Sequence, residues 1–65
     1  MNKFTILSLN EDNTTFTATR DDEEYIIDLY GANVPLEDYI GSEIVVTDYF
    51  MFIGQIICTK WEEVI

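Results

Sequence analysis

Paired carboxylates are the only catalytic groups that this sequence contains in quantity. They stand at residues 11–12, 21–24, 37–38 and 62–63. General acid–base catalysis requires two carboxylates in different surroundings, usually one buried and one solvated, inside a pocket. These pairs are sequence neighbours in predicted turns and at the C-terminus, where both members are solvated. We therefore interpret them as surface residues and expect a protein that is not an enzyme.

The sequence also lacks the residues that nucleophilic catalysis, metal binding and phosphate binding require. The sequence has one Cys and no His, so neither a zinc site nor a Ser–His–Asp or Cys–His arrangement can be assembled. The oxygen-rich segments 10–13 and 21–24 lack the spacing of a calcium loop, and the three glycines are too scattered for a phosphate loop. No cofactor and no metal site are expected.

The single cysteine points to a reducing compartment. Cys58 follows Ile56 and Ile57 in an apolar strand pattern, which is typical of an inert buried thiol. It has no second cysteine to pair with, and one free thiol fits an intracellular setting. No stretch approaches the roughly 20 apolar residues of a membrane span. We therefore expect a cytoplasmic protein without a membrane segment.

Charge and hydrophobicity together restrict the class of partner. Thirteen Asp and Glu against three Lys and Arg give a net charge of −10, while 48% of the residues are hydrophobic, too many for a disordered acidic tail. Phosphate contacts depend on Lys and Arg, so direct binding to DNA or RNA is disfavoured. The aromatic cluster at 49–52 could stack bases, but Lys3, Arg20 and Lys60 are far apart in the sequence. No direct nucleic-acid partner is expected.

Strand periodicity dominates the chain. Alternation or enrichment in β-branched and aromatic residues marks five segments: residues 3–9, 14–20, 24–30, 44–50 and 55–61. In the second segment, Phe16 and Ala18 are predicted on one face. In the third, the apolar face is predicted to carry Tyr25, Ile27 and Leu29.

The last strand is predicted by alternation to have two unlike faces. One face carries Ile57 and Trp61, and the other carries Ile56 and Cys58.

The connections between these strands indicate the fold. Segments 10–13 and 21–23 predict hairpin turns. Residues 35–41 predict one short helix, because Pro35 suits the first helical position, acidic residues occupy the first turn and Gly41 follows the end. This order indicates an all-β, five-stranded small barrel that is OB-like; an SH3-like barrel, whose helical turn comes later, is the alternative. Residues 1–65 are expected to form a single domain with a marginal core.

The segment 51–54 (Met-Phe-Ile-Gly) occupies the predicted turn between the fourth and fifth strands, although turns prefer Gly, Asn, Asp, Pro and Ser. Either the strand continues and buries these residues, or they form an exposed apolar tip that contacts a partner or a second copy. Successive turns alternate between the two ends of the strands. The acidic run 21–24 is therefore predicted at the same end as residues 50–53, and the acidic pairs 11–12 and 37–38 at the other end.

An apolar centre beside an acidic rim suits a protein-binding surface. The sequence favours a non-enzymatic acidic binding protein, an inhibitor that presents negative charge to a basic nucleic-acid-handling protein such as a nuclease, as a nucleic-acid mimic or a site blocker. The alternative is an interaction module that forms homo-oligomers or joins a larger complex through its apolar aromatic surface. The predicted partner-binding residues are Asp21, Asp22, Glu23 and Glu24 for charge, Phe52 as an apolar anchor, and Glu37 and Asp38 as the alternative face.

Overall fold

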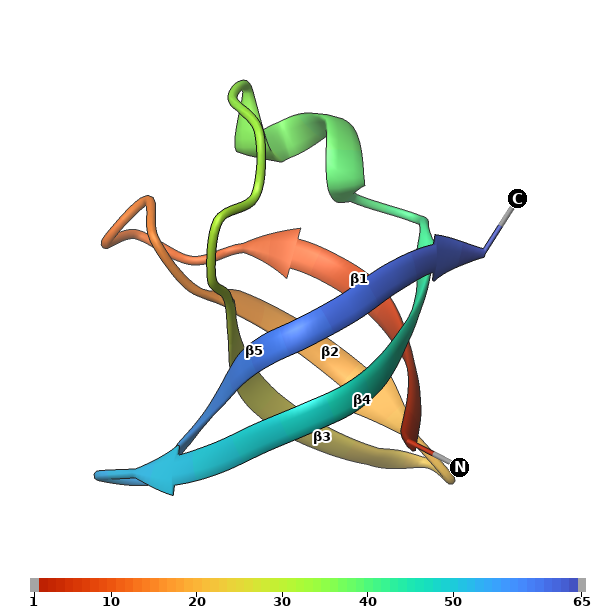
Figure 1. Cartoon of the computed structure of the whole chain (residues 1–65). Helices are drawn as coiled ribbons and strands as arrows, with labels where there is room; N and C mark the ends of the chain where they lie inside the picture. The colour runs from red at the N-terminus through yellow and green to blue at the C-terminus, as the bar shows by residue number, and fades with distance from the viewer. Residues whose placement is uncertain (1, 65) are drawn as a thin grey trace.

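Five strands wrap around one apolar core in the computed structural model, which describes residues 2–64 (Figure 1). The strands are β1 Asn2–Leu9, β2 Phe16–Arg20, β3 Glu23–Leu29, β4 Glu43–Phe52 and β5 Gln55–Val64. One 3-10 turn, η1 (Leu36–Tyr39), lies between β3 and β4.

The strands close into a barrel in the order β1-β2-β3-β5-β4, because β4 pairs back with β1. β3 and β5 run parallel, whereas the other neighbours are antiparallel. The helical turn follows the third strand, as the OB-like prediction requires and the SH3-like alternative does not. The predicted five-stranded barrel is therefore confirmed.

Several element boundaries differ from the prediction for local reasons. β4 continues to Phe52, because only Ile53 and Gly54 separate it from β5, with φ of 46° and 76°. Two successive positive φ values are those of a type I′ hairpin turn. β5 continues to Val64, because residues 62–64 pair with residues 43–45 of β4. The predicted helix at 35–41 is a single 3-10 turn, and Pro35 precedes it in an extended conformation.

β2 begins later than predicted because its first residues are bound into a turn. The Oδ1 atom of Asp12 accepts the backbone N–H groups of Thr14 and Thr15, each at 2.9 Å. These bonds favour the charged carboxylate and lower the pKa of Asp12. The Asp12 side chain therefore stabilises the β1–β2 turn, and β2 begins only at Phe16.

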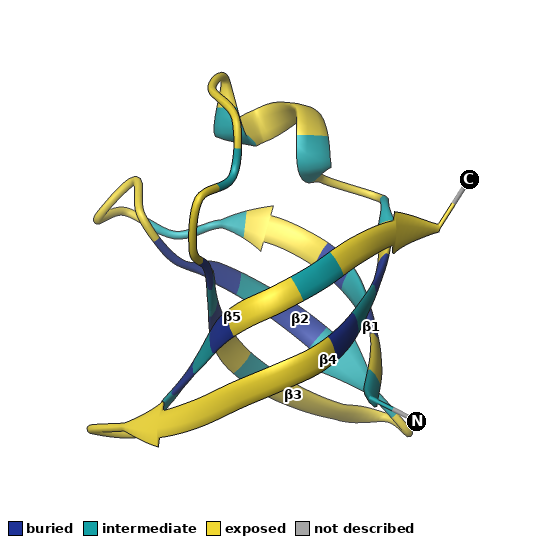
Figure 2. Ribbon diagram, viewed as in Figure 1, coloured by how far each residue is buried: buried dark blue, intermediate teal, exposed yellow. Residues whose placement is uncertain are grey.

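The core lies inside the barrel and takes alternate residues from all five strands (Figure 2). Its buried members are Phe4, Ile6, Phe16, Ala18, Ile27, Leu29, Ile44, Val46, Ile56 and Cys58. The inward faces predicted for the second and third strands are confirmed, with Tyr25 half-buried against this core.

Trp61 does not lie on the face predicted for it. Its ring packs against the core on the side of Cys58, whereas Ile57 lines the outer surface. The β4–β5 register shifts between Val46 and Tyr49. A bulge of this kind inserts a residue and reverses the facing of the side chains beyond it. The prediction for Trp61 assumed regular alternation along the strand, which does not hold across this bulge, and it is therefore wrong.

η1 covers the upper end of the barrel, as the molecule is oriented in Figure 1. The ring of Tyr39 packs edge-on against Phe16 at 6.2 Å and against Trp61 at 5.6 Å between centroids. The Trp61 indole N–H donates to the Tyr30 carbonyl oxygen at 3.1 Å. The two ring contacts join the turn to β2 and β5, and the hydrogen bond joins β5 to the residue that follows β3, so this end is closed.

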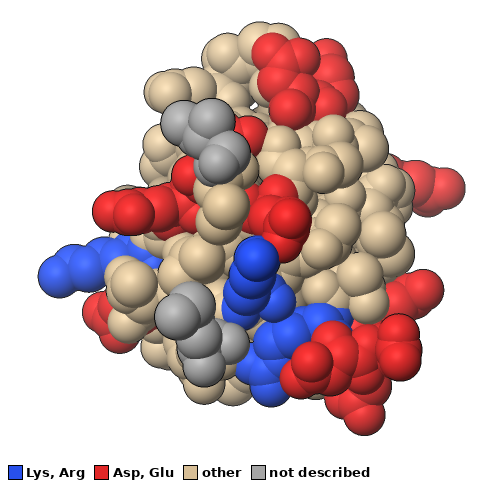
Figure 3. All heavy atoms as spheres, turned by 90° about the vertical axis from the view of Figure 1, so that its right-hand side faces the viewer, with Lys and Arg blue, Asp and Glu red and all other residues tan. Residues whose placement is uncertain are grey.

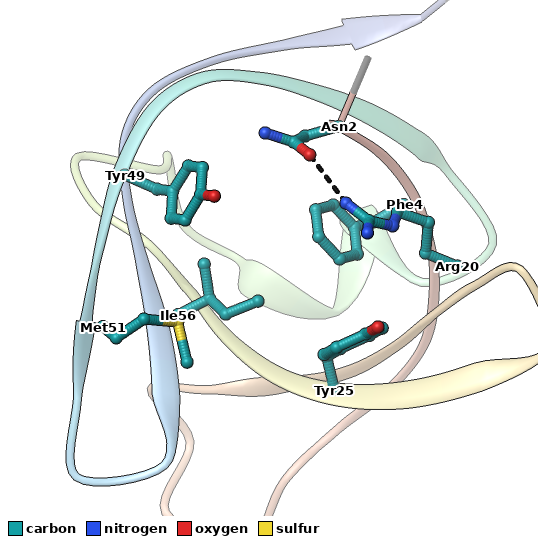
Figure 4. A pocket seen from close by; sticks show the side chains of 7 residues that line it. All are labelled: Asn2, Phe4, Arg20, Tyr25, Tyr49, Met51 and Ile56. Atoms are coloured by element: carbon teal, nitrogen blue, oxygen red, sulfur yellow. Dashed lines mark hydrogen bonds between the residues drawn. The ribbon is translucent and has the colours of Figure 1, made fainter.

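The lower end of the barrel stays open, and Arg20 lies beside the opening. The Arg20 guanidinium carbon lies 5.6 Å from the ring centroid of Phe4 and 5.8 Å from that of Tyr25. Its Nη1 atom donates to the Asn2 side-chain oxygen at 2.6 Å (Figure 4). Cation–π contacts and this hydrogen bond hold the guanidinium at the side of the opening.

Candidate functional site

The β4–β5 hairpin exposes apolar side chains at its tip. Met51, Phe52 and Ile53 are 61%, 56% and 85% exposed, and the projecting hairpin is coloured as exposed in Figure 2. The strand does continue beyond residue 50, but it does not bury these residues. Of the two alternatives that the sequence left open for residues 51–54, the structure shows the exposed apolar tip.

Two threonines fix the bend at which the hairpin leaves the barrel wall. Thr47 Oγ donates to the Lys60 carbonyl at 3.3 Å, and Thr59 Oγ donates to the Asp48 carbonyl at 3.1 Å. Beyond the bend, residues 49–52 pair with β5, and no second strand pairs with them within residues 2–64. The hairpin therefore has an edge whose backbone groups are available to another chain.

Ile53 holds a conformation that its side chain disfavours. A β-branched residue with a φ of 46° is a backbone outlier. Ile53→Asn places the favoured Asn-Gly pair in the type I′ turn, and we expect it to raise the free energy of unfolding by about 1 kcal/mol. Urea denaturation measures the change. Ile53→Thr, which keeps the β-branch, should give no such gain, and an unchanged or lower stability of Ile53→Asn would contradict the argument.

The inner face of the hairpin borders a pocket at the lower opening of the barrel, which we call the mouth pocket (Figure 4). Its volume is about 180 Å³, and it is lined by Asn2, Phe4, Arg20, Tyr25, Tyr49, Met51 and Ile56. Tyr49 and Met51 come from the hairpin, whereas Arg20 and Tyr25 come from the strands that flank the 21–22 turn. The mouth pocket therefore lies between the hairpin and the acidic run.

The outer face of the same hairpin borders a larger depression, the outer groove, of about 520 Å³. Three strands form it, with Phe50 and Phe52 from β4, Gln55, Ile57 and Thr59 from β5, and Asp28 and Tyr30 at the end of β3. Cross-strand pairing sets Phe50 beside Ile57 and Ile57 beside Asp28. The groove therefore has an apolar floor, one aromatic wall and one wall that carries a carboxylate.

The acidic turn, residues 21–24, lies at the same end as the hairpin (Figure 1). Asp21 and Asp22 have φ of 53° and 66°, which short acidic side chains tolerate. Glu23 accepts a hydrogen bond from the Tyr25 hydroxyl at 2.9 Å, which raises the pKa of Tyr25. The prediction that the acidic residues 21–24 and the apolar tip lie at the same end of the barrel is confirmed.

The remaining predicted contact residues lie elsewhere. Glu37 and Asp38 are exposed in η1 at the upper end, away from Phe52. Seen from the side of the two chain ends, carboxylates are spread over the surface, and the Lys and Arg side chains lie in the lower half of the view (Figure 3). Exposed apolar side chains also flank η1, at Val34 and Ile40, but only the lower end, among the described residues, joins a projecting apolar hairpin to an acidic turn.

Among residues 2–64, Asp28 is the one charged side chain that lines the outer groove. The salt bridges of the described residues join Lys3 to Glu43 at 2.9 Å and Arg20 to Asp21 at 3.8 Å, so none of them neutralises Asp28. Burial, together with the charge of Asp12, raises the pKa of Asp28. Its ionised form therefore opposes folding.

Asp28→Asn is expected to stabilise the protein at neutral pH. Because the folded pKa lies above the ordinary 3.8, ionisation lowers the stability of the wild type as pH rises through the folded pKa. The gain of Asp28→Asn should be present at pH 7 and vanish below the unfolded pKa. Urea midpoints of both proteins over this pH range measure it, and a gain that persists in acid would indicate a cause other than charge.

Cys58 is a free cysteine that lies buried in the core. Burial, with the Asp28 charge in second place, raises the pKa of its thiol from 9.0 to about 11. We expect a thiol-specific reagent to label it only after unfolding. Because the folded pKa is raised, the associated stability is complete below pH 9 and is lost as pH rises toward 11. Cys58→Ala should remove this part of the alkaline loss, and an identical pH dependence in both proteins would refute it.

Sequence reasoning missed the outer groove. Alternation along 24–30 placed Asp28 opposite the apolar face, but nothing local indicates that β5 lies beside β3. In the part of the chain described, no three His, Cys, Asp or Glu side chains are grouped as a metal site. Nor is any helix among those residues long and apolar enough to cross a membrane. Comparison of the chain with protein-family models, curated proteins and solved structures gave no match.

Proposed function

We propose that this chain is a non-enzymatic cytoplasmic binding protein that presents its lower end to a basic protein that handles nucleic acid. One observation carries the proposal: the exposed apolar hairpin and the acidic turn occupy the same end, on either side of the mouth pocket. Protein interfaces combine an apolar centre with a polar rim in this way. The net charge of −10 selects for a cationic partner and accelerates encounter.

The inhibitory part of the proposal follows from what such a partner normally binds. A groove that holds a phosphate backbone is lined by Lys and Arg. Carboxylates at the acidic turn would compete for these cations, while the hairpin would add apolar contacts that a nucleic acid does not make. Binding at this end therefore blocks the partner's substrate site.

A pull-down from the source cells with tagged protein, eluted by stepwise salt and read by mass spectrometry, tests this function. We expect a basic nucleic-acid enzyme to be released at moderate salt, since charge-led binding weakens as salt rises. Recovery of no such protein would overturn the proposal.

Two matched double variants locate the contact. Asp21→Asn/Asp22→Asn and Glu37→Gln/Asp38→Asn each remove two charges, from the lower and the upper end respectively. Asn tolerates the positive φ of residues 21 and 22. The lower-end variant should weaken partner binding about tenfold and the upper-end variant much less. Equal losses of affinity in the two variants would indicate that binding depends on net charge and not on one end of the barrel. A larger loss in the upper-end variant would assign the contact to η1.

A second candidate function is assembly, and the available edge of residues 49–52 favours it. Two copies could pair these edges antiparallel about a twofold axis, which joins their sheets and covers apolar side chains. Sedimentation equilibrium distinguishes this function from the first. A dimer that persists at high salt would favour assembly, whereas a monomer at all concentrations would exclude it.

A further inference from the structure

We propose that the outer groove binds an arginine side chain of the basic partner, with the guanidinium beside Asp28 and among the aromatic rings of Tyr30, Phe50 and Phe52. This inference rests on the proposed function and adds to it the site and the residue type. It places a second contact on the outer face of the β4–β5 hairpin, opposite the inner face that borders the mouth pocket.

The spacing of the strands gives the groove a width that suits one side chain. Ile57 pairs with Phe50 on one side and with Asp28 on the other, and neighbouring strands lie roughly 4.8 Å apart. The backbones that carry Phe50 and Asp28 are therefore about 10 Å apart. An aliphatic stem laid over Ile57 would bring its charged end to Asp28.

The electrostatics select a cation. The lining residues include one carboxylate and no Lys or Arg, and the salt bridges of the described residues leave Asp28 unneutralised. Aromatic ring faces carry negative potential and attract cations. A phosphate or carboxylate ligand would meet the Asp28 carboxylate and no Lys or Arg side chain among these lining residues, so the groove favours a cation over an anion.

The chemistry favours arginine over lysine. A guanidinium is planar, stacks on aromatic rings and can donate two parallel hydrogen bonds to one carboxylate. Tyr30 is 70% exposed, and Phe50 and Phe52 are 51% and 56% exposed, so their ring faces are available for stacking. An ammonium is more strongly hydrated and gains less from such surroundings.

The position of Asp28 in the groove is unfavourable for folding and favourable for binding a cation. Burial in the groove disfavours its charge, as argued above, and an incoming guanidinium would neutralise that charge. Strained or destabilising groups of this kind concentrate at functional sites.

The test uses three capped peptides, acetyl-Val-Leu-X-Leu-Val-amide, in which X is arginine, lysine or citrulline. Citrulline keeps the shape of arginine and lacks its charge. Titration of ¹⁵N-labelled protein, followed by amide chemical shifts, should show the arginine peptide moving residues 28–30 and 55–59. We expect it to bind at least about tenfold more tightly than the citrulline peptide, with the lysine peptide between them.

Variants complete the test. Asp28→Asn, which should fold at least as well as the wild type, should reduce the arginine peptide to the affinity of the citrulline peptide. Glu62→Gln removes one exposed carboxylate of β5 that does not line the groove, and it should leave the affinity unchanged. Equal affinities for arginine and citrulline peptides, or shifts confined to the acidic turn, would overturn the groove assignment.

The outcome separates this inference from the function on which it rests. If the pull-down recovers a basic partner and the peptide avoids the groove, the groove assignment fails and the proposed function stands. If the peptide enters the groove in an Asp28-dependent manner and no basic partner is recovered, the site stands and the proposed function fails.

Discussion

The double variant Phe50→Ser/Phe52→Ser is expected to bind the partner recovered by pull-down at least about 100-fold more weakly, because central aromatic side chains carry most of the binding energy of such interfaces. Both side chains are more than half exposed, so their removal deletes little buried surface. The melting temperature should therefore stay close to that of the wild type. Biolayer interferometry and calorimetry measure the two quantities.

A matched control removes apolar surface elsewhere. Leu7 and Ile40 are each 45% exposed and lie in β1 and just after η1. Leu7→Ser/Ile40→Ser should bind like the wild type if the hairpin is the contact. If this control weakens binding as much as the hairpin variant does, the hairpin is not the anchor. A hairpin variant with wild-type affinity would exclude Phe50 and Phe52 directly.

Phe16→Ala is expected to have the largest effect on folding, a loss of about 4 kcal/mol in the free energy of unfolding. Phe16 is fully buried, and its ring also contacts Tyr39, through which η1 is held on the barrel. Phe16→Ala thus removes buried apolar volume from the core and, at the same time, the ring against which Tyr39 of η1 packs. A domain of this length has a total stability of roughly 3–10 kcal/mol.

Urea denaturation followed by circular dichroism tests this expectation. Phe16→Ala should be largely unfolded at 37 °C or show a much lower urea midpoint, whereas Phe16→Leu, which keeps most of the apolar volume, should stay folded. A cooperative transition of Phe16→Ala at the wild-type midpoint would show that the core is not marginal. The single cysteine allows no internal disulfide to offset the loss.

The two ends of the barrel could be assigned from the sequence because strand direction alternates with each connection. The acidic turn and residues 50–53 therefore share an end whatever the neighbours of each strand are. Exposure of the tip could not be decided in advance. The tip is exposed because β1 pairs with β4 only as far as Val46, so that the rest of β4 extends beyond β1. The extent of this pairing depends on the lengths of two strands that are distant in the chain.

Local sequence patterns and composition are sufficient to predict the strand count, the inward faces of β2 and β3, the helical turn after the third strand, and the excess of negative charge. Each of these depends on neighbouring residues and on composition. Two features appear only in the tertiary structure: the parallel contact of β3 with β5, which assembles the outer groove, and the bulge at Thr59 of β5, which turns Trp61 toward the core. Register and closure arise from contacts between residues far apart in the chain, and local periodicity carries no information about them.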